Sequence, residues 1–271
     1  MNRRKRTVVY SIISLALLLV PIILSVLLSN DQLSTQLTER NEPPSWGNPF
    51  GTDWLGRDML TRTMKGLALS LGVGMTAASI SVLIAGTLGL MAATLGQTVD
   101  RIITWLVDLF LSIPHLVMLI LIAFVSGGGV RGVIIAVALT HWPSLTRVIR
   151  AEILYLKSCE FVMISKHMGR SKWWIATRHF LPHLIPQFIV GTLLAFPHAI
   201  LHEAAITFLG MGLSPHQPAI GIILSESMRY LSTGMWWLAF FPGLCLLIVV
   251  RAFDVLAENL YALINPNRSQ E

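Results

Sequence analysis

The sequence predicts an all-α integral membrane protein with six transmembrane helices. Of its 271 residues, 54% are hydrophobic and only 13% are charged, well below the roughly 25% charge of ordinary soluble domains. The mean hydropathy is correspondingly high, at +0.67. The apolar residues also gather in six stretches, each close to the ~20 residues that a helix needs to cross a bilayer. We therefore expect lipid to surround most of this chain.

The first predicted span follows the basic run Arg3-Arg4-Lys5-Arg6. Its apolar stretch exceeds the 7–15 residues typical of a secretory signal core, so we expect a retained anchor and not a cleaved signal. This anchor and the polar segment after it form a predicted N-terminal unit over 1–66, and a main membrane domain is predicted over 67–265. The six predicted spans are 8–28, 67–95, 102–125, 133–149, 184–209 and 236–256.

The second span carries small residues at strict four-residue spacing, and the next two spans contain prolines. Small residues on one helical face allow backbones to approach closely in a membrane. This face is predicted to pack either within the subunit or against another subunit. Pro114 and Pro143 are predicted to interrupt or end the third and fourth spans. The small residues of the second span are Ser81, Ala85, Gly89 and Ala93.

The fifth span contains His198, His202 and Glu203. The two histidines are four residues apart and so share one helical face. Ionisable groups inside a span are costly and indicate a substrate pathway or site, and imidazole is a common ligand of nickel, zinc and copper. We predict all three residues on a pathway, with His198 and His202 as metal ligands. Hydrogen bonding between helices and recognition of a metal chelate are the alternatives.

The basic residues orient the chain. They concentrate before the first span and in 151–183, so the positive-inside rule places both termini and this segment in the cytosol. The segments 29–66 and 210–235 are then extracytoplasmic. The net charge of +6 is explained by this placement, and no nucleic-acid partner is expected.

The cytosolic segment from Glu160 to Pro182 reads EFVMISKHMGRSKWWIATRHFLP. A helix is predicted from Ile153 to His167, and Gly169 supplies the positive φ that ends it and reverses the chain. Ser171 is the predicted N-cap of a second helix, which Leu181-Pro182 stops before the fifth span. Two short helices joined at a glycine form a compact knob. The alternative is an amphipathic helix lying on anionic lipid.

This segment resembles the EAA loop of bacterial ABC-importer permeases. The glycine and the Leu-Pro pair of that motif are present in register, whereas Met163-Ile164-Ser165 stands in the Glu-Ala-Ala slots. The resemblance assigns ATPase coupling to Glu160, Met163, Ser165, Gly169, Arg178, Leu181 and Pro182.

Further motifs resemble the peptide/nickel subfamily, and specifically its second, C-type permease subunit. They are Gly51-Thr52-Asp53-Trp54-Leu55-Gly56-Arg57-Asp58, Thr207-Phe208-Leu209-Gly210-Met211-Gly212, Phe241-Pro242-Gly243 and Asn265-Pro266. The stretch around His198 and His202 is similar to that of nickel-transport permeases, which also place two histidines four residues apart.

The resemblance implies a type I ABC-importer permease with a cytosolic coupling-helix loop in the bacterial inner membrane. Its expected partners are a homologous second permease, cytosolic ATPases, an extracytoplasmic binding protein and membrane lipid. The chain has no phosphate-binding loop, so it is not expected to be an enzyme or to bind a cofactor, and partner subunits use the ATP. The expected substrate is nickel or a related transition metal, possibly chelated, carried by alternating access; di- or oligopeptides are the alternative.

An intramembrane metalloprotease is a remote alternative. His202-Glu203-Ala204-Ala205 begins like the H-E-x-x-H motif of zinc proteases, but Ile206 occupies the position of the second ligand. A channel would need no ATPase-docking knob. The two cysteines, Cys159 and Cys245, predict neither a disulfide framework nor a metal site.

Overall fold

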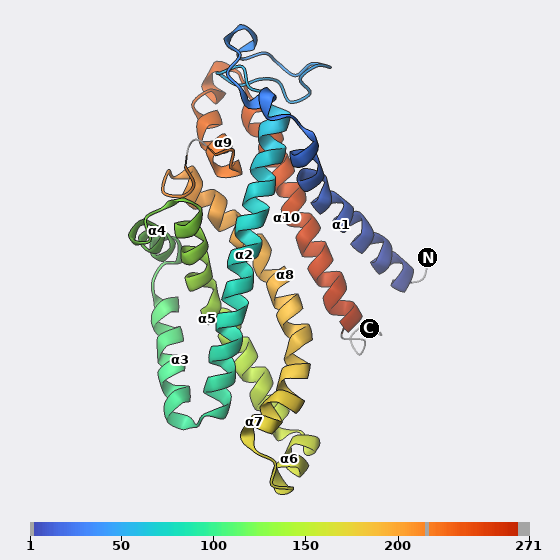
Figure 1. The fold of residues 1–271 in the computed structure, drawn as a ribbon, viewed down its shortest axis with the longest axis vertical. Helices are drawn as coiled ribbons and strands as arrows, with labels where there is room; N and C mark the ends of the chain where they lie inside the picture. The colour runs from blue at the N-terminus through green and yellow to red at the C-terminus, as the bar shows by residue number, and fades with distance from the viewer. Residues whose placement is uncertain (1–2, 215–216, 265–271) are drawn as a thin grey trace.

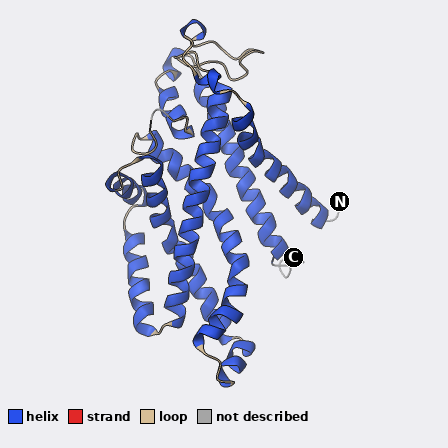
Figure 2. Ribbon diagram, in the orientation of Figure 1, coloured by secondary structure: helices blue, strands red, loops and turns tan. Residues whose placement is uncertain are grey.

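The computed structural model describes residues 3–214 and 217–264; Asn265-Pro266 lie outside these ranges. The described residues form helices and loops without a strand (Figure 2). Five of their helices are long and apolar enough to cross a membrane, and a bent helix pair raises the number of spans to six if it counts as one. The predicted all-α membrane fold is therefore confirmed.

The long helices are α1 (Arg3–Leu27), α2 (Met59–Thr94), α5 (Gly129–Ser158), α8 (Leu181–Phe208) and α10 (Trp237–Ile264). The shorter helices are α3 (Gln97–Ser112), α4 (His115–Val125), α6 (Glu160–His167), α7 (Lys172–Ile175) and α9 (Ile220–Met228). Single turns are η1 (Asn30–Leu33), η2 (Leu37–Glu39), the π-helical η3 (Ala176–Phe180) and η4 (Leu231–Thr233).

The long helices run side by side between two ends of an elongated bundle (Figure 1). One end carries α6 and α7, and the other carries α9 and the segment between α1 and α2. The first helix and the last both have their chain-terminal ends on the α6–α7 side. Helices α1 and α10 end partway along the bundle (Figure 1), and α3 and α4 together make the third candidate span.

The third predicted span is not one continuous helix. Helices α3 and α4 meet at an angle of 98°, because Ile113 is extended (φ −89°, ψ 137°) immediately before Pro114. A proline disfavours the helical conformation in the residue that precedes it. The prediction for Pro114 is thus confirmed, whereas the prediction for Pro143 is wrong, since α5 continues through that residue.

Two boundaries also differ from the sequence prediction. The second long helix begins at Met59, eight residues before the predicted start at 67, because the Asp58 side chain caps it by accepting a hydrogen bond from Thr61 N (2.7 Å). The segment 210–235, predicted as an extracytoplasmic loop, contains α9. Ile220 and Ile223 on this helix are fully buried, so packing against the bundle stabilises a helix too short to span a membrane.

Small residues of α2 pack against α5 and α8 inside this subunit. A Cβ atom added to Gly89 would lie 2.8 Å from Cγ2 of Ile149 on α5, and one added to Gly86 would lie 2.7 Å from the Phe188 ring on α8. Ser81 and Ala85 are completely buried. Packing within the subunit, one of the two alternatives for this helix face, is therefore what the structure shows.

A buried arginine joins α2 to α9 at the end of the bundle opposite α6. Arg62 is only 4% exposed. It donates to Asp53 Oδ2 (2.6 Å) and to Glu226 Oε2 on α9 (2.8 Å). Arg57 also binds Asp53 Oδ2, through its Nε (2.7 Å). Charges this deeply buried are stable only when they are paired, so Asp53 and Glu226 fix the position of Arg62.

This network explains the motif at residues 51–58. Asp53 Oδ1 accepts the backbone N–H groups of Leu55 and Arg57, both at 2.9 Å, which closes the turn. Gly56 has a φ of 73°, and a Cβ atom there would lie 1.8 Å from the Gln36 carbonyl oxygen. Only glycine fits that position. The motif is therefore a folding element that anchors the start of α2.

Replacing Gly89 by leucine tests the close packing of α2. We expect Gly89→Leu to lower the free energy of unfolding by about 1–3 kcal/mol, as overpacked sites commonly do. Gly72→Leu is the matched control, because a Cβ atom on Gly72 has no heavy atom within 4 Å. Thermal unfolding of the purified membrane protein in detergent measures both. Equal stability of the two variants would contradict the packing argument.

Replacing Arg62 by methionine tests the ion network. We expect a loss near the lower end of the ~3–5 kcal/mol typical of broken buried pairs, because Arg57 still faces Asp53 in the variant. The control is Arg40→Met, an exposed arginine in the segment between α1 and α2 that also contains Asp53. The same unfolding measurement applies, and a loss no greater than that of the control argues against a structural role for the network.

Candidate functional site

The predicted coupling segment forms a knob, defined here as residues 160–180, at one end of the bundle (Figure 1). The predicted helix 153–167 is broken at Cys159, whose extended backbone (φ −71°, ψ 142°) separates α5 from α6. Gly169 then reverses the chain with a φ of 75°, as predicted. Ser171 caps α7 by accepting a hydrogen bond from Trp174 N (3.2 Å), which also agrees with the prediction.

Leu181-Pro182 does not stop the second helix of the knob. Helices α7, η3 and α8 form one continuous helical stretch from Lys172 to Phe208. Proline lacks an N–H group and its ring clashes with a regular α-helix. The π-helical turn η3 (Ala176–Phe180) lies directly before Pro182 and is a wider form of helix. It lets the chain continue, so the knob leads straight into α8.

A polar contact and a shared apolar core hold the knob together. The Ser165 hydroxyl donates to Phe161 O (2.9 Å) and lies 2.8 Å from Nε2 of His179. Because Ser165 has one hydrogen to donate, His179 Nε2 is the donor in the second contact. Val162 and Phe180 are buried in the same cluster as Ile153 of α5. The knob is therefore fixed rigidly to α5 and α8.

The structure places the seven predicted coupling residues on the knob and at its junction with α8. Ser165 is buried, and Glu160, Met163, Gly169, Arg178, Leu181 and Pro182 are exposed. A cavity of about 490 Å³ opens between the knob and the turn joining α2 to α3. Four basic side chains line it: Lys157, Lys166, Arg170 and Lys172. This surface is suited to a partner with acidic and apolar groups.

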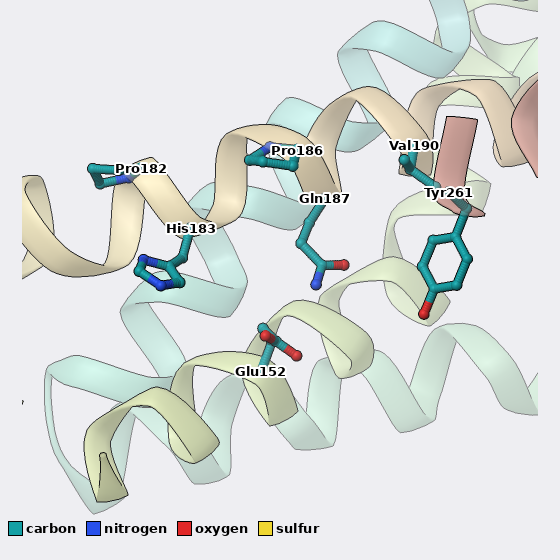
Figure 3. A pocket seen from close by; sticks show the side chains of 7 residues that line it. All are labelled: Glu152, Pro182, His183, Pro186, Gln187, Val190 and Tyr261. Atoms are coloured by element: carbon teal, nitrogen blue, oxygen red, sulfur yellow. The ribbon is translucent and has the colours of Figure 1, made fainter. Parts of the chain in front are cut away.

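A second cleft, of about 350 Å³, lies beside the start of α8. His183 and Gln187 on α8 and Glu152 on α5 point into the space between these helices, and Tyr261 of α10 borders it (Figure 3). Pro182 also lines this cleft. A polar opening therefore adjoins the junction between the knob and the bundle.

The three residues predicted on the substrate pathway face different neighbours. His198 is exposed. Glu203 is completely buried, beside Ser70 of α2, and its Oε1 accepts a hydrogen bond from Thr207 Oγ1 (3.0 Å). His202 instead meets two histidines from other helices. The structure thus does not gather His198, His202 and Glu203 into one set of ligands.

The histidines that meet His202 are His115 at the start of α4 and His141 within α5. The ring centroids of His115 and His202 are 4.5 Å apart, those of His115 and His141 are 4.8 Å apart, and those of His141 and His202 are 5.2 Å apart. One nitrogen from each ring lies within 4.8 Å of the other two. All three side chains are partly exposed. We call this group the histidine cluster.

His115 and His141 are absent from the site predicted by sequence. Each is a lone ionisable residue in an apolar segment, the same signal that identified His198 and His202. Their convergence, however, depends on the 98° bend between α3 and α4, which brings His115 across to α5 and α8. The assignment of His198 and His202 as metal ligands stays a prediction.

Comparison with known proteins gives one family and several related proteins. Residues 85–270 match the family described as "binding-protein-dependent transport system inner membrane component". The chain is 34% identical over 230 residues to a dipeptide transport system permease protein of Bacillus subtilis, covering 85% of this chain and 72% of that protein. It is 32% identical over 266 residues to the protein of the same description from Alkalihalophilus pseudofirmus, covering 98% and 87%.

These matches confirm the resemblance to ABC-importer permeases that the knob and the motifs predicted. They agree with a membrane subunit that is not itself an enzyme. The closer likeness to nickel-transport permeases stays a prediction, as do the division at residues 66 and 67 and the orientation of the termini.

Proposed function

The chain belongs to the family of binding-protein-dependent transport system inner membrane components, and from that premise we propose how it works. It forms part of the translocation pathway of an ATP-driven importer in a bacterial inner membrane. A homologous second permease completes the pathway, cytosolic ATPases bind the knob, and an extracytoplasmic binding protein delivers the substrate at the α9 end. The termini then lie in the cytosol.

The observation that carries this proposal is the rigid connection between the knob and two long helices. The knob projects at the end of the bundle (Figure 1) and exposes apolar side chains such as Trp173, which is 76% exposed, and Met168, which is 71% exposed. Large exposed apolar groups next to basic residues indicate a protein-docking surface. A partner that displaces this surface moves α5 and α8 with it.

Alternating access follows from that geometry. Closure of the ATPases draws the knobs of the two permeases together, and the continuous helix from Lys172 to Phe208 carries the displacement towards the opposite end of the bundle. A rigid-body movement of packed elements between two states requires no chemistry in this chain. The cleft at Glu152, His183 and Gln187 adjoins the moving junction and gives the substrate a polar exit.

Short peptides are our first candidate substrate, because the two related proteins described above are named as dipeptide permeases. That support favours the peptide alternative over the nickel interpretation of the sequence. A transition-metal ion, free or chelated, is the second candidate. One structural observation favours it, namely the histidine cluster.

Replacing Gly169 tests the coupling role of the knob. We expect Gly169→Val to reduce uptake several-fold while ATP hydrolysis continues, because a β-branched residue is strained at a φ of 75°. A Cβ atom at this position meets nothing within 4 Å, so the effect comes from the backbone alone. Gly169→Asn is the matched control, since asparagine tolerates this conformation.

The measurement is the ratio of substrate uptake to ATP hydrolysis in proteoliposomes that contain the complete transporter. Gly169→Asn should keep a ratio close to that of the intact chain. Unchanged uptake in Gly169→Val would show that the knob does not couple the two activities.

Uptake of a labelled dipeptide and of radioactive nickel tests the substrate proposal. With the intact chain, the peptide proposal expects dipeptide uptake and no nickel signal. His202→Ala should then leave dipeptide uptake within about twofold, because substitutions away from the peptide contacts have small effects. The control is Leu194→Ala, at an exposed position on the same helix. Nickel uptake that collapses in His202→Ala, with normal assembly, refutes the peptide proposal.

A further inference from the structure

We infer that His115, His141 and His202 form a binding site for a divalent transition-metal ion that is part of the imported substrate. This inference deepens the second candidate substrate and rests on the proposed function as a permease. It differs from the ligand pair predicted by sequence, because it includes His115 and His141 and leaves out His198. Three separate helices supply the three imidazoles.

The nitrogens are already gathered to nearly the required separation. Nitrogens bound to one zinc ion lie roughly 3.0–3.5 Å apart, since each Zn–N bond is about 2.0–2.1 Å long. In the histidine cluster one nitrogen from each ring lies within 4.8 Å of the others.

The orientation of His141 is that of a metal ligand. Its Nδ1 lies 2.9 Å from Val137 O, and a carbonyl oxygen can only accept, so Nδ1 carries the hydrogen. This tautomer leaves a lone pair on Nε2, which is buried and has no hydrogen-bond partner among the described residues. A histidine that binds a metal commonly donates its other N–H group to a backbone carbonyl in this way.

His115 shows the same lack of a partner. Its Nε2 is buried without a hydrogen bond in the described part of the chain. Buried polar atoms in native proteins almost always have a partner, and two such nitrogens side by side, from α4 and α5, are unusual. Within the described ranges no hydrogen bond joins any two of the three rings, so such bonds do not explain why they converge. A metal ion that accepts a lone pair from each of these nitrogens explains why the rings converge.

The donor set selects the class of ion. Imidazole nitrogen suits nickel, zinc and copper, whereas magnesium and calcium prefer oxygen ligands. Glu203 is turned towards Ser70 and Thr207 and does not add a carboxylate. Three protein ligands leave at least one coordination position open. An open position allows the ion to enter and leave, as imported cargo must, and it can hold a nitrogen or oxygen of a small chelator.

The location agrees with transient binding. All three rings are partly exposed, and His198, one turn before His202 on α8, is exposed. Two members of the cluster, His141 on α5 and His202 on α8, lie on the helices to which the knob is fixed. The movement that ATP drives at the knob therefore acts on two of the three ligands.

Metal binding to the complete transporter in lipid nanodiscs tests the inference. The complex is purified with an affinity tag that lacks histidine, stripped of metal, and titrated with Ni²⁺, Zn²⁺ or Mg²⁺. Bound metal is counted by mass spectrometry and the affinity is measured by calorimetry. We expect one Ni²⁺ or Zn²⁺ ion per chain and no site for Mg²⁺.

The variants are His115→Gln, His141→Ala and His202→Ala, and the control is Leu194→Ala, at an exposed position on α8. Each cluster variant should weaken binding at least about tenfold, as even the loss of supporting groups around a metal does, and the control should not. Equal affinity in the cluster variants and the control overturns the inference, as does the lack of bound metal in the intact complex.

A spectroscopic measurement on the intact complex tests the metal site even if the variants fail to assemble. Co²⁺ bound to the intact complex should give visible absorption bands typical of nitrogen ligands, and Ni²⁺ should displace it. Absence of these bands overturns the inference without any variant.

Dipeptide uptake by the same preparations separates this inference from the peptide proposal. Dipeptide uptake without metal binding refutes the metal site and leaves the peptide proposal standing. Metal binding without dipeptide uptake supports the metal site and refutes the peptide proposal.

Discussion

The close approach of α2 to α5 and α8 is the constraint on which the rest of the structure depends. Lipid offers no hydrophobic drive for helices to associate, so they must gain contact by approaching closely. Gly86 and Gly89 permit this, because any side chain at either position would overlap Phe188 or Ile149. With α2 held at this distance, its N-terminal end presents Arg62 to Asp53 and Glu226. Its C-terminal end, at Thr94, borders the cavity beside the knob. One tightly packed helix thus links the two ends of the bundle.

The knob depends on this packing for its mechanical properties. Gly169 makes the reversal possible, but rigidity comes from the buried cluster that joins Val162 and Phe180 to α5 and from the contact between Ser165 and His179. The resemblance to the EAA loop placed Ser165 where the family motif has alanine. In this chain the hydroxyl takes part in a contact that alanine could not make. Ser165, which departs from the family motif, therefore stabilises the same structural element, the knob.

Helix α8 connects the two features that bear on function. It continues from the knob at Leu181 and carries His202 near its other end. The π-helical turn before Pro182 preserves this continuity. The broken third passage contributes His115 at the start of α4, and α5 contributes His141. Displacement of the knob therefore changes the positions of His141 and His202 relative to His115. This arrangement connects the proposed coupling step to the proposed metal site without a separate relay.

The sequence by itself determined the fold class, five of the six spans and the reversal at Gly169, because these depend on local properties, and the resemblance of its motifs indicated the family. Apolar length, glycine conformation and proline sterics act over a few residues. Local properties also explain the break at Pro114, but not its 98° angle. Only the tertiary structure decided that α9 folds, that α5 passes through Pro143, and that His202 meets His115 and His141 while Glu203 turns to Ser70. These outcomes depend on packing between helices far apart in the sequence, where the separation and rotation of each pair set which side chains meet.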